Sequence, residues 1–380
     1  MLRAPVILHW DGEKMDRVGL YIHVPFCVKK CGYCDFYSVT ADEDTMDAYT
    51  RAVCDKLSGM NGDFTADTVY FGGGTPSVLG GRRIAEILKA AYPNIAQDAE
   101  ITTEANPGDE LDEFFAYCAD AGINRVSLGM QSAVDGELAL LTRRHTVADV
   151  ERAISTARKR GINNISLDLM VGIEEQNEIS LMRSVDYCAA LGVDHVSAYM
   201  LKIEDGTPFA ARRDQSAFAD EDRSADLYIA AVERLAAHGY EQYEISNFAR
   251  NGAVSRHNLK YWNCEPYIGI GPAAHSFYGG RRFFYPRSLA NFIADVHPTD
   301  DGSGGDFDEY AMLRLRLTDG LRRDMVLQRF PDCDERYAEM VKQAEKYAGA
   351  GLCTADGERI ALNSHGFLLS NSIICDLLAD

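Results

Sequence analysis

Short apolar runs alternate with amphipathic stretches along the first half of the chain. Apolar runs rich in β-branched and aromatic residues predict six strands: Val18–Val24, Thr68–Phe71, Ala99–Ala105, Arg125–Met130, Asn164–Val171 and His195–Leu201. Helical periodicity predicts helices near Glu43–Leu57, Arg82–Ala91, Leu111–Ala121, Val147–Arg160, Ile179–Leu191 and Asp220–Ala237. Glycines of the kind that end helices follow four of them: Gly122, Gly161, Gly192 and Gly239. The alternation predicts an α/β fold of parallel βαβ units, either a partial or full barrel or a doubly wound sheet.

The pattern divides the chain into four parts: a tail over residues 1–17, a barrel core over 18–210, an extension of the barrel over 211–300 and a small domain over 306–380. The glycine- and aspartate-rich stretch Pro298–Asp306 is predicted to be a linker. Beyond it, Tyr310–Leu317 and Asp332–Ala348 have helical patterns, and Thr354–Leu362 with Gly366–Leu369 predicts a hairpin or wing. We therefore expect a second domain of the α+β class.

Composition narrows the possible partners and the location. The 380 residues carry a formal net charge of −20, which argues against nucleic acid because phosphate binding needs a basic surface. No apolar stretch is long enough to span a bilayer, and the first residues lack the basic and apolar regions of a signal peptide. We expect a cytoplasmic protein whose ten cysteines are reduced thiols or metal ligands.

Three of the cysteines are clustered. Cys27, Cys31 and Cys34 follow the first predicted strand with the spacing Cys-x3-Cys-x2-Cys. Three thiolates can bind three irons of a cubane and leave the fourth iron open to a small molecule. A structural zinc site is the alternative, but it would need a fourth ligand that this loop does not supply.

Polar and glycine residues recur near the ends of the next strands. Gly73, Gly74 and Thr75 follow the second strand, Glu104 lies near the end of the third, and Gln131 and Asp168 belong to the fourth and fifth. Because the carboxyl ends of parallel strands share one face of a barrel, we expect these residues to form one ligand site together with the cysteine loop.

These motifs resemble a known family. The cysteine spacing with an aromatic residue, Tyr33, before the third cysteine is the signature of radical S-adenosylmethionine proteins, and the preceding Tyr-x-His-x-Pro-Phe-Cys from Tyr21 resembles the HemN/HemW branch. The resemblance implies a partial (βα)6 parallel barrel with a small C-terminal α+β domain similar to a winged helix. It also implies a [4Fe–4S] cluster, S-adenosyl-L-methionine bound at the open iron, and an electron donor that drives release of a 5′-deoxyadenosyl radical.

The resemblance also assigns residues to the cofactor. It implies that Cys27, Cys31 and Cys34 hold the cluster. The residues that it places around S-adenosylmethionine are Tyr21, Tyr33, Gly73, Gly74, Thr75, Glu104, Gln131, Arg143 and Asp168. Gly73, Gly74 and Thr75 would hold the methionine end, and Glu104 the ribose hydroxyls. The family more often has glycine where Thr142 stands, and Arg144 is a neighbouring alternative to Arg143.

A second motif resembles the heme chaperones of this branch. His257-Asn-x-x-Tyr261-Trp262 combines a candidate axial ligand with two rings that can pack on a porphyrin. His275 is a second candidate ligand, and a purely structural role for His257 is the alternative. The resemblance implies heme as cargo and heme-accepting proteins as partners.

Two functions of different classes fit the resemblance. One is a heme chaperone; the other is oxygen-independent coproporphyrinogen III dehydrogenase, and a radical enzyme acting on another tetrapyrrole is a third option. The dehydrogenases carry a fourth cysteine two residues after the third, where this chain has Phe36, and a longer leader before the first strand. We therefore favour the chaperone. The heme acceptor, turnover of S-adenosylmethionine, homodimer formation and peripheral association with a membrane stay open.

Overall fold

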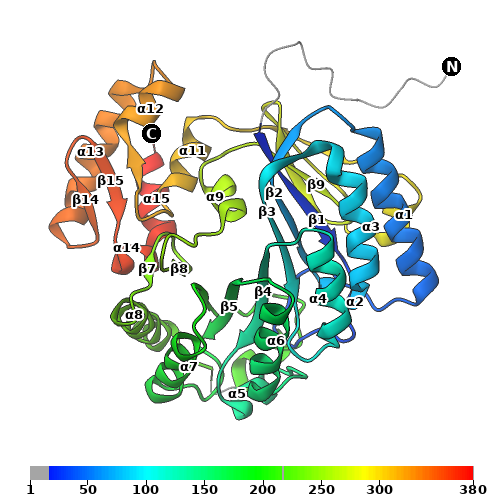
Figure 1. Cartoon of the computed structure of the whole chain (residues 1–380). Helices are drawn as coiled ribbons and strands as arrows, with labels where there is room; N and C mark the ends of the chain where they lie inside the picture. Colours follow the sequence, from blue (N-terminus) through cyan, green and yellow to red (C-terminus); the bar gives the residue numbers. More distant parts are fainter. Residues whose placement is uncertain (1–16, 216–217, 380) are drawn as a thin grey trace.

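A computed structural model describes residues 17–215 and 218–379 of the chain (Figure 1). The predicted tail lies outside the described residues, apart from Arg17, which begins the first strand. Six strands form the centre: β1 (Arg17–Val24), β2 (Thr65–Gly73), β3 (Ile95–Ala105), β4 (Arg125–Gln131), β5 (Asn164–Val171) and β6 (His195–Met200). They are parallel and lie side by side in sequence order. A doubly wound sheet would reverse its strand order at a switch point, so the structure confirms the partial barrel.

Helices cover the outer face of these strands (Figure 1). The long ones are α1 (Glu43–Gly59), α3 (Gly81–Ala91), α4 (Leu111–Asp120), α6 (Val147–Lys159), α7 (Glu178–Ala190) and α8 (Glu221–Ala237). Short helical segments join them: α2 (Pro76–Leu79), η1 (Tyr92–Asn94), α5 (Asp135–Leu140) and η2 (Ala210–Gln215). Their apolar faces pack on the strands and form the main hydrophobic core. Within the described residues, no helix is both long and apolar enough to cross a membrane.

The sheet continues beyond the barrel strands at both ends. Next to β1 lie β9 (Tyr267–Ile270), β10 (His275–Tyr278), β11 (Arg281–Phe284) and β12 (Thr299–Ser303); next to β6 lie β8 (Asn247–Ala249) and β7 (Glu241–Gln242). The prediction of a linker over Pro298–Asp306 is wrong for β12, which pairs with β11. Its aspartates and glycine do not prevent strand pairing because the strand lies at the exposed edge, where charged side chains stay in water.

The C-terminal residues form a second hydrophobic core beside the barrel, drawn in orange and red in Figure 1. Its elements are α11 (Phe307–Arg314), β13 (Leu321–Arg322), α12 (Arg323–Arg329), α13 (Asp334–Gly349), β14 (Cys353–Ala355), β15 (Arg359–Leu362), α14 (Ser364–Leu368) and α15 (Ser370–Leu378). This is an α+β arrangement, as predicted. The predicted hairpin exists as β14 and β15, but Gly366–Leu369 is not part of it. The Asn363 side chain accepts from Gly366 N and starts helix α14 there instead.

Two short helices complete the barrel extension. Helix α9 (Arg256–Trp262) carries the His-Asn-x-x-Tyr-Trp motif and contacts β2 of the barrel. Helix α10 (Leu289–Ile293) follows β11 and packs against α1. Both helices begin at a serine, Ser255 or Ser288, whose hydroxyl accepts a hydrogen bond from a backbone N–H of the first turn.

Candidate functional site

The cysteine loop follows strand β1 and has a closed base. Cys27, Cys31 and Cys34 are each partly exposed and line one cavity. At the base, Cys27 N donates to Val39 O at 3.0 Å, and Val39 N donates to Pro25 O at 2.7 Å. These backbone bonds hold the two ends of the loop together, so the thiols are presented from a fixed position at the carboxyl end of the strand.

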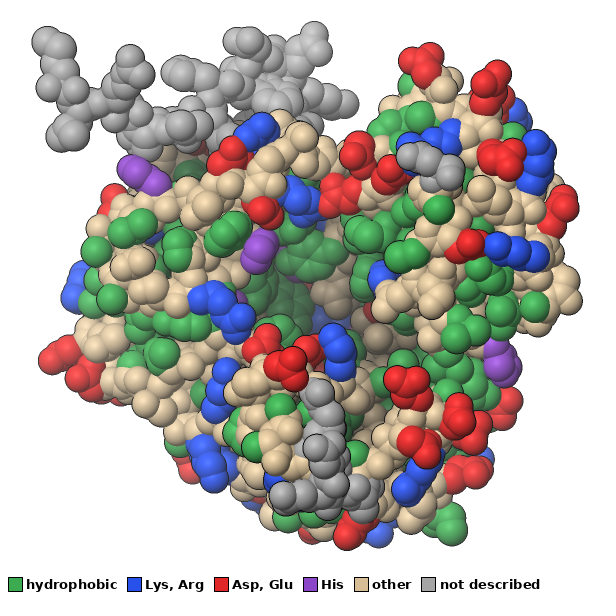
Figure 2. Space-filling view, turned by 180° about the vertical axis from the view of Figure 1, so that it is seen from behind, with side chains coloured by type: hydrophobic (Ala, Val, Ile, Leu, Met, Phe, Trp, Pro, Cys, Tyr) green, Lys and Arg blue, Asp and Glu red, His purple; other side chains and the backbone are tan. Residues whose placement is uncertain are grey.

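We name this cavity the cluster cavity; its volume is about 600 Å³. Except for Tyr21, it is lined by every residue predicted to bind the cluster or S-adenosylmethionine: Cys27, Cys31, Tyr33, Cys34, Gly73, Gly74, Thr75, Glu104, Gln131, Arg143 and Asp168. Figure 2 shows a hollow in the centre of the face opposite to that of Figure 1, with hydrophobic side chains on its walls and charged ones around its rim. The structure thus brings together residues from five strands and their loops.

The three thiols of the loop do not converge on a single point. Within residues 17–215 and 218–379, no three His, Cys, Asp or Glu side chains converge on a position for one metal ion. A single zinc ion would need each sulfur about 2.3 Å from one point, together with a fourth ligand. Arg143 Nη1 donates to Cys31 Sγ at 3.6 Å, and its buried Nε has no partner in the described part of the chain. A cation with an unused donor beside Cys31 suits an anionic ligand in this cavity.

The glycine run at the end of β2 packs closely against β1 and the start of the cysteine loop. Gly74 N donates to Val24 O at 2.8 Å, and a Cβ on Gly74 would lie 2.7 Å from that oxygen. Gly73 has φ +105°, and a Cβ there would lie 2.4 Å from the His23 ring. Thr75 Oγ1 lies 3.4 Å from Cys27 Sγ. The glycines therefore let two chain segments meet, in addition to any approach to a ligand.

Two partly buried carboxylates of the barrel line the cluster cavity. Glu104 Oε1 accepts from Tyr70 Oη at 2.9 Å, and Asp168 Oδ1 accepts from Ser127 Oγ at 3.1 Å. Burial, reinforced by the charge of Asp168, raises the pKa of Glu104 to about 7. Burial also raises the pKa of Asp168. Two carboxylates in the same cavity are stabilised in the ionised form when a ligand donates hydrogen bonds to them.

The structure separates the two neighbouring arginines. Arg143 lines the cluster cavity and donates to Gly129 O at 2.8 Å, whereas Arg144 forms an ion pair with Asp109 at 2.7 Å outside it. Thr142, which lies between α5 and Arg143 in the chain, has φ +58°, a conformation that favours glycine. The Thr142 hydroxyl accepts from Gly32 N at 2.9 Å, so threonine ties this turn to the cysteine loop.

Strand β4 contributes a residue that the sequence analysis missed. Arg125, Ser127, Gly129 and Gln131 alternate along β4 and all line the cluster cavity. Arg125 is 1% exposed, and its Nε has no hydrogen-bond partner among the described residues. The sequence signal that could have identified Arg125 is the alternation of side chains along a strand, because it puts Arg125 on the same face of β4 as Gln131. Gln131 itself has φ +67°, a strained backbone of the kind found at ligand sites.

The residues predicted to contact heme do not all line a cavity. His257 is 1% exposed, and both ring nitrogens are engaged: Nδ1 with Thr68 Oγ1 and Nε2 with Tyr261 Oη, each at 2.8 Å. Burial lowers the pKa of His257 to about 3. Trp262 is partly buried and lines neither the cluster cavity nor the adjoining cavity described in the next paragraph. These contacts are those expected of a structural histidine, and the heme role of His257 stays a prediction.

A second cavity of about 470 Å³ adjoins the first, and we name it the aromatic cavity. It is lined by Tyr21, His23, Asp35, Phe36, Tyr37, Tyr261, Tyr267, Ala273, His275, Phe284, Tyr285 and Arg287. Tyr21 lies here rather than in the cluster cavity, because its hydroxyl bonds His23 Nδ1 at 3.1 Å on the same strand. Asp35 and Phe36 line both cavities, so the cysteine loop forms the wall between them.

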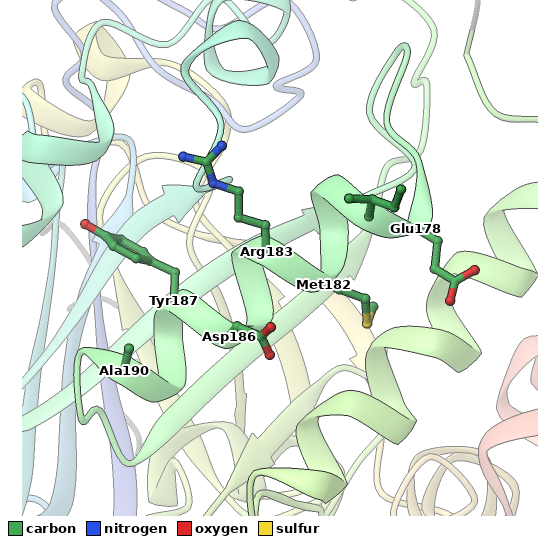
Figure 3. A pocket seen from close by; sticks show the side chains of 7 residues that line it. Glu178, Met182, Arg183, Asp186, Tyr187 and Ala190 are labelled. Atoms are coloured by element: carbon green, nitrogen blue, oxygen red, sulfur yellow. The ribbon is translucent and has the colours of Figure 1, made fainter.

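A third hollow lies on the outer face of α7 and contains none of the motif residues (Figure 3). Two of its polar side chains are already paired: Tyr187 donates to Glu151 at 2.7 Å, and Asp186 accepts from Arg234 at 2.6 Å. The hollow is therefore a surface feature of a single helix rather than part of the candidate site.

Comparisons with known proteins agree with the motifs. Residues 21–188 match the radical SAM superfamily, and residues 308–369 match the HemN C-terminal domain. The curated heme chaperone HemW of Mycobacterium tuberculosis is 38% identical over 95% of this chain and 94% of that protein. The heme chaperone HemW of Escherichia coli is 33% identical over 97% and 100%.

A solved structure shares the fold. The coproporphyrinogen III oxidase HemN of Escherichia coli, described as a radical SAM enzyme, aligns with a TM-score of 0.82 and covers 96% of this chain and 90% of its own. Its sequence identity is 21%, so it shows the common architecture alone. The relatives at higher identity match over nearly their whole length, and the chain therefore belongs to the HemW family of radical SAM proteins.

Proposed function

We propose that this protein is a heme chaperone that binds heme and delivers it to heme proteins. The observation that carries the proposal is similarity over nearly the whole chain to proteins named heme chaperones, at 38% and 33% identity, against 21% to the oxidase HemN. A shared fold alone does not decide function, because one fold hosts many activities. The proposal therefore also depends on Phe36, which stands where the dehydrogenases have a fourth cysteine.

The cluster cavity would hold a [4Fe–4S] cluster and S-adenosylmethionine, the groups that the radical SAM family implies. Cys27, Cys31 and Cys34 would each bind one iron, which leaves one iron to the cofactor. When bound, the two groups supply one-electron chemistry, for which the protein needs an electron donor as a partner. The protein contributes orientation: the backbone at Gly74 borders the thiols, and Glu104 would accept hydrogen bonds from the ribose hydroxyls.

Other residues of the cavity would bind the remaining groups of S-adenosylmethionine. Arg143 has an unused donor beside Cys31 and would pair with the carboxylate of the methionine end. Gln131 and Asp168 lie on neighbouring strands and would contact the amino group or the ribose. Tyr33 lies on the cysteine loop and would cover the cofactor from that side. These roles combine what the family resemblance implies with the positions of the residues in the cluster cavity.

The alternative function is oxidative decarboxylation of coproporphyrinogen III. Phe36 stands where the dehydrogenases have a fourth cysteine, and its side chain is 68% exposed at the mouth of both cavities. A phenyl ring can neither bind iron nor exchange protons or electrons with a substrate. This argues for the chaperone and against the dehydrogenase, whereas a radical reaction on another tetrapyrrole would not need that cysteine.

The deciding experiment offers the reconstituted protein two ligands separately. Heme is titrated in one arm, and coproporphyrinogen III with S-adenosylmethionine and a reductant is incubated in the other. We expect saturable heme binding and no protoporphyrinogen IX. Protoporphyrinogen IX formed over several turnovers, or no heme binding, would overturn the proposal.

A further inference from the structure

We propose that the aromatic cavity is the heme site, with His275 as the iron ligand and Arg287 as the partner of a propionate. The inference rests on the proposed function and names the site that this function requires. A volume of about 470 Å³ lies within the usual 300–1,000 Å³ of ligand pockets. Rings from four segments line it, which provides the flat apolar surface that a porphyrin needs.

The other histidines of the described chain are engaged or lie elsewhere. Five of them form ring hydrogen bonds: His23, His145, His195, His238 and His257. Within the described residues, His275, His297 and His365 are exposed and make no side-chain hydrogen bond. Of these three, His275 lines the aromatic cavity, and neither of the others does. Because neutral imidazole is a common axial donor, His275 is the histidine positioned for heme iron.

The position of His275 is fixed although its ring nitrogens are free to bind. It begins strand β10 and pairs directly with Phe284 of β11. The two rings are stacked, with centroids 5.1 Å apart and planes 25° apart. A sheet backbone and a stacked neighbour restrict the imidazole to few orientations, so little conformational entropy is lost when it binds iron.

His257 then acts as a positioning residue. Its Nε2 bonds the hydroxyl of Tyr261, which lines the aromatic cavity, and its Nδ1 bonds Thr68 on β2. Tyr261 in turn packs edge-to-face on Tyr267, with centroids 4.6 Å apart. The motif on α9 therefore orients two rings of the cavity wall, while the iron ligand comes from the adjacent hairpin.

An anion site lies at the edge of the same cavity. Arg287 is 57% exposed and donates to Asp35 O at 2.5 Å, and its guanidinium is 3.7 Å from the Asp35 carboxylate. This long and exposed ion pair leaves donors for a second carboxylate, such as a heme propionate. Asp35 belongs to the cysteine loop, so a heme held here would lie directly beside the cluster cavity.

The test is a titration of full-length, cluster-loaded protein with ferric heme, read as difference spectra against the same protein without heme. We expect His275→Ala to weaken binding about tenfold or more and to lose the spectrum of imidazole ligation. Added imidazole should restore that spectrum, which a misfolded cavity would not allow. His297→Ala, an exposed histidine outside the cavity, should match wild type, and His257→Ala should keep the imidazole spectrum with lower affinity.

The outcomes separate the site from the function. Unchanged binding and spectrum in His275→Ala, or a lost spectrum that imidazole does not restore, would overturn the site while the chaperone stands. Failure of the wild type to bind heme would overturn both. For the anion site, Arg287→Gln should weaken heme binding about tenfold or more but leave the affinity for heme dimethyl ester unchanged. Equal losses for both ligands would exclude a propionate contact.

Discussion

Glu104 is the position where a single substitution should separate S-adenosylmethionine binding from cluster assembly. Glu104→Gln keeps the volume and the oxygen that accepts from Tyr70 at 2.9 Å, but removes the charge. A ribose hydroxyl would then donate to a neutral amide oxygen instead of a carboxylate. Among the described residues, none of the three loop cysteines forms a hydrogen bond with this side chain, so iron content should stay at the wild-type level.

The magnitude follows from the charge and from the pKa. A hydrogen bond to a charged group contributes about 1.5–3 kcal/mol, or roughly ten- to a hundredfold in affinity. The Glu104 pKa of about 7 means that the carboxyl is mostly protonated at pH 6 and mostly ionised at pH 8. Donation by the ligand favours the ionised form, so wild-type affinity should rise about tenfold over this range. The glutamine side chain cannot ionise, so the affinity of Glu104→Gln should lack this increase with pH.

The assay is calorimetric titration of S-adenosylmethionine into reconstituted protein at pH 6, 7 and 8, with iron counted in each sample. Glu113→Gln, an exposed carboxylate on α4, is the matched control and should behave as wild type. The ratio of wild-type to Glu104→Gln affinity cancels the ionisation of the ligand itself, and it should grow with pH. Equal affinities at pH 8, or a ratio independent of pH, would refute the ribose contact.

Three further predictions concern the cysteine loop and its neighbours. Replacing any of the three loop cysteines by alanine, for example Cys31→Ala, should abolish the cluster in iron counting because each supplies one of three iron ligands, whereas exposed Cys375→Ala should retain it. The protein should not convert coproporphyrinogen III. After incubation with S-adenosylmethionine and a reductant, chromatography should detect no protoporphyrinogen IX with either wild type or Phe36→Ser. Gly73→Ala should lower the melting temperature by several degrees, because its Cβ would lie 2.4 Å from His23 at φ +105°, and an unchanged melting curve would contradict the packing role.

The barrel could be predicted because its elements are set by local patterns. Strand β5 matches the predicted range Asn164–Val171, and the other five barrel strands overlap their predictions. Each is flanked by a helix whose apolar residues recur with helical spacing, which any buried face requires. The four predicted helix-ending glycines all have positive φ: Gly122 at 88°, Gly161 at 86°, Gly192 at 66° and Gly239 at 79°. Residue type and position are enough to predict a conformation that depends on neighbouring residues in the chain.

The partners of distant segments could not be predicted in the same way. His257 bonds Thr68 across 189 positions of the chain, and nothing near either residue indicates the pairing. Strand β12 has the composition of a loop, and it becomes a strand because β11 presents a free edge beside it. The same holds for Thr142, whose hydroxyl meets Gly32 only after the fold is formed. These contacts depend on the tertiary structure rather than on periodicity.

Phe36 lies between the cluster cavity and the aromatic cavity. It is a large apolar side chain held 68% exposed on a loop that lines both cavities. Fully burying a phenylalanine contributes about 1.5–3 kcal/mol relative to leaving it exposed, so a ligand that covers this ring would gain part of that free energy. A porphyrin in the aromatic cavity would cover this ring, whereas a cysteine there would offer reactivity and little apolar area. On the proposed function, the residue that stands in place of the dehydrogenases' fourth cysteine would therefore also contribute apolar contact area to a bound heme.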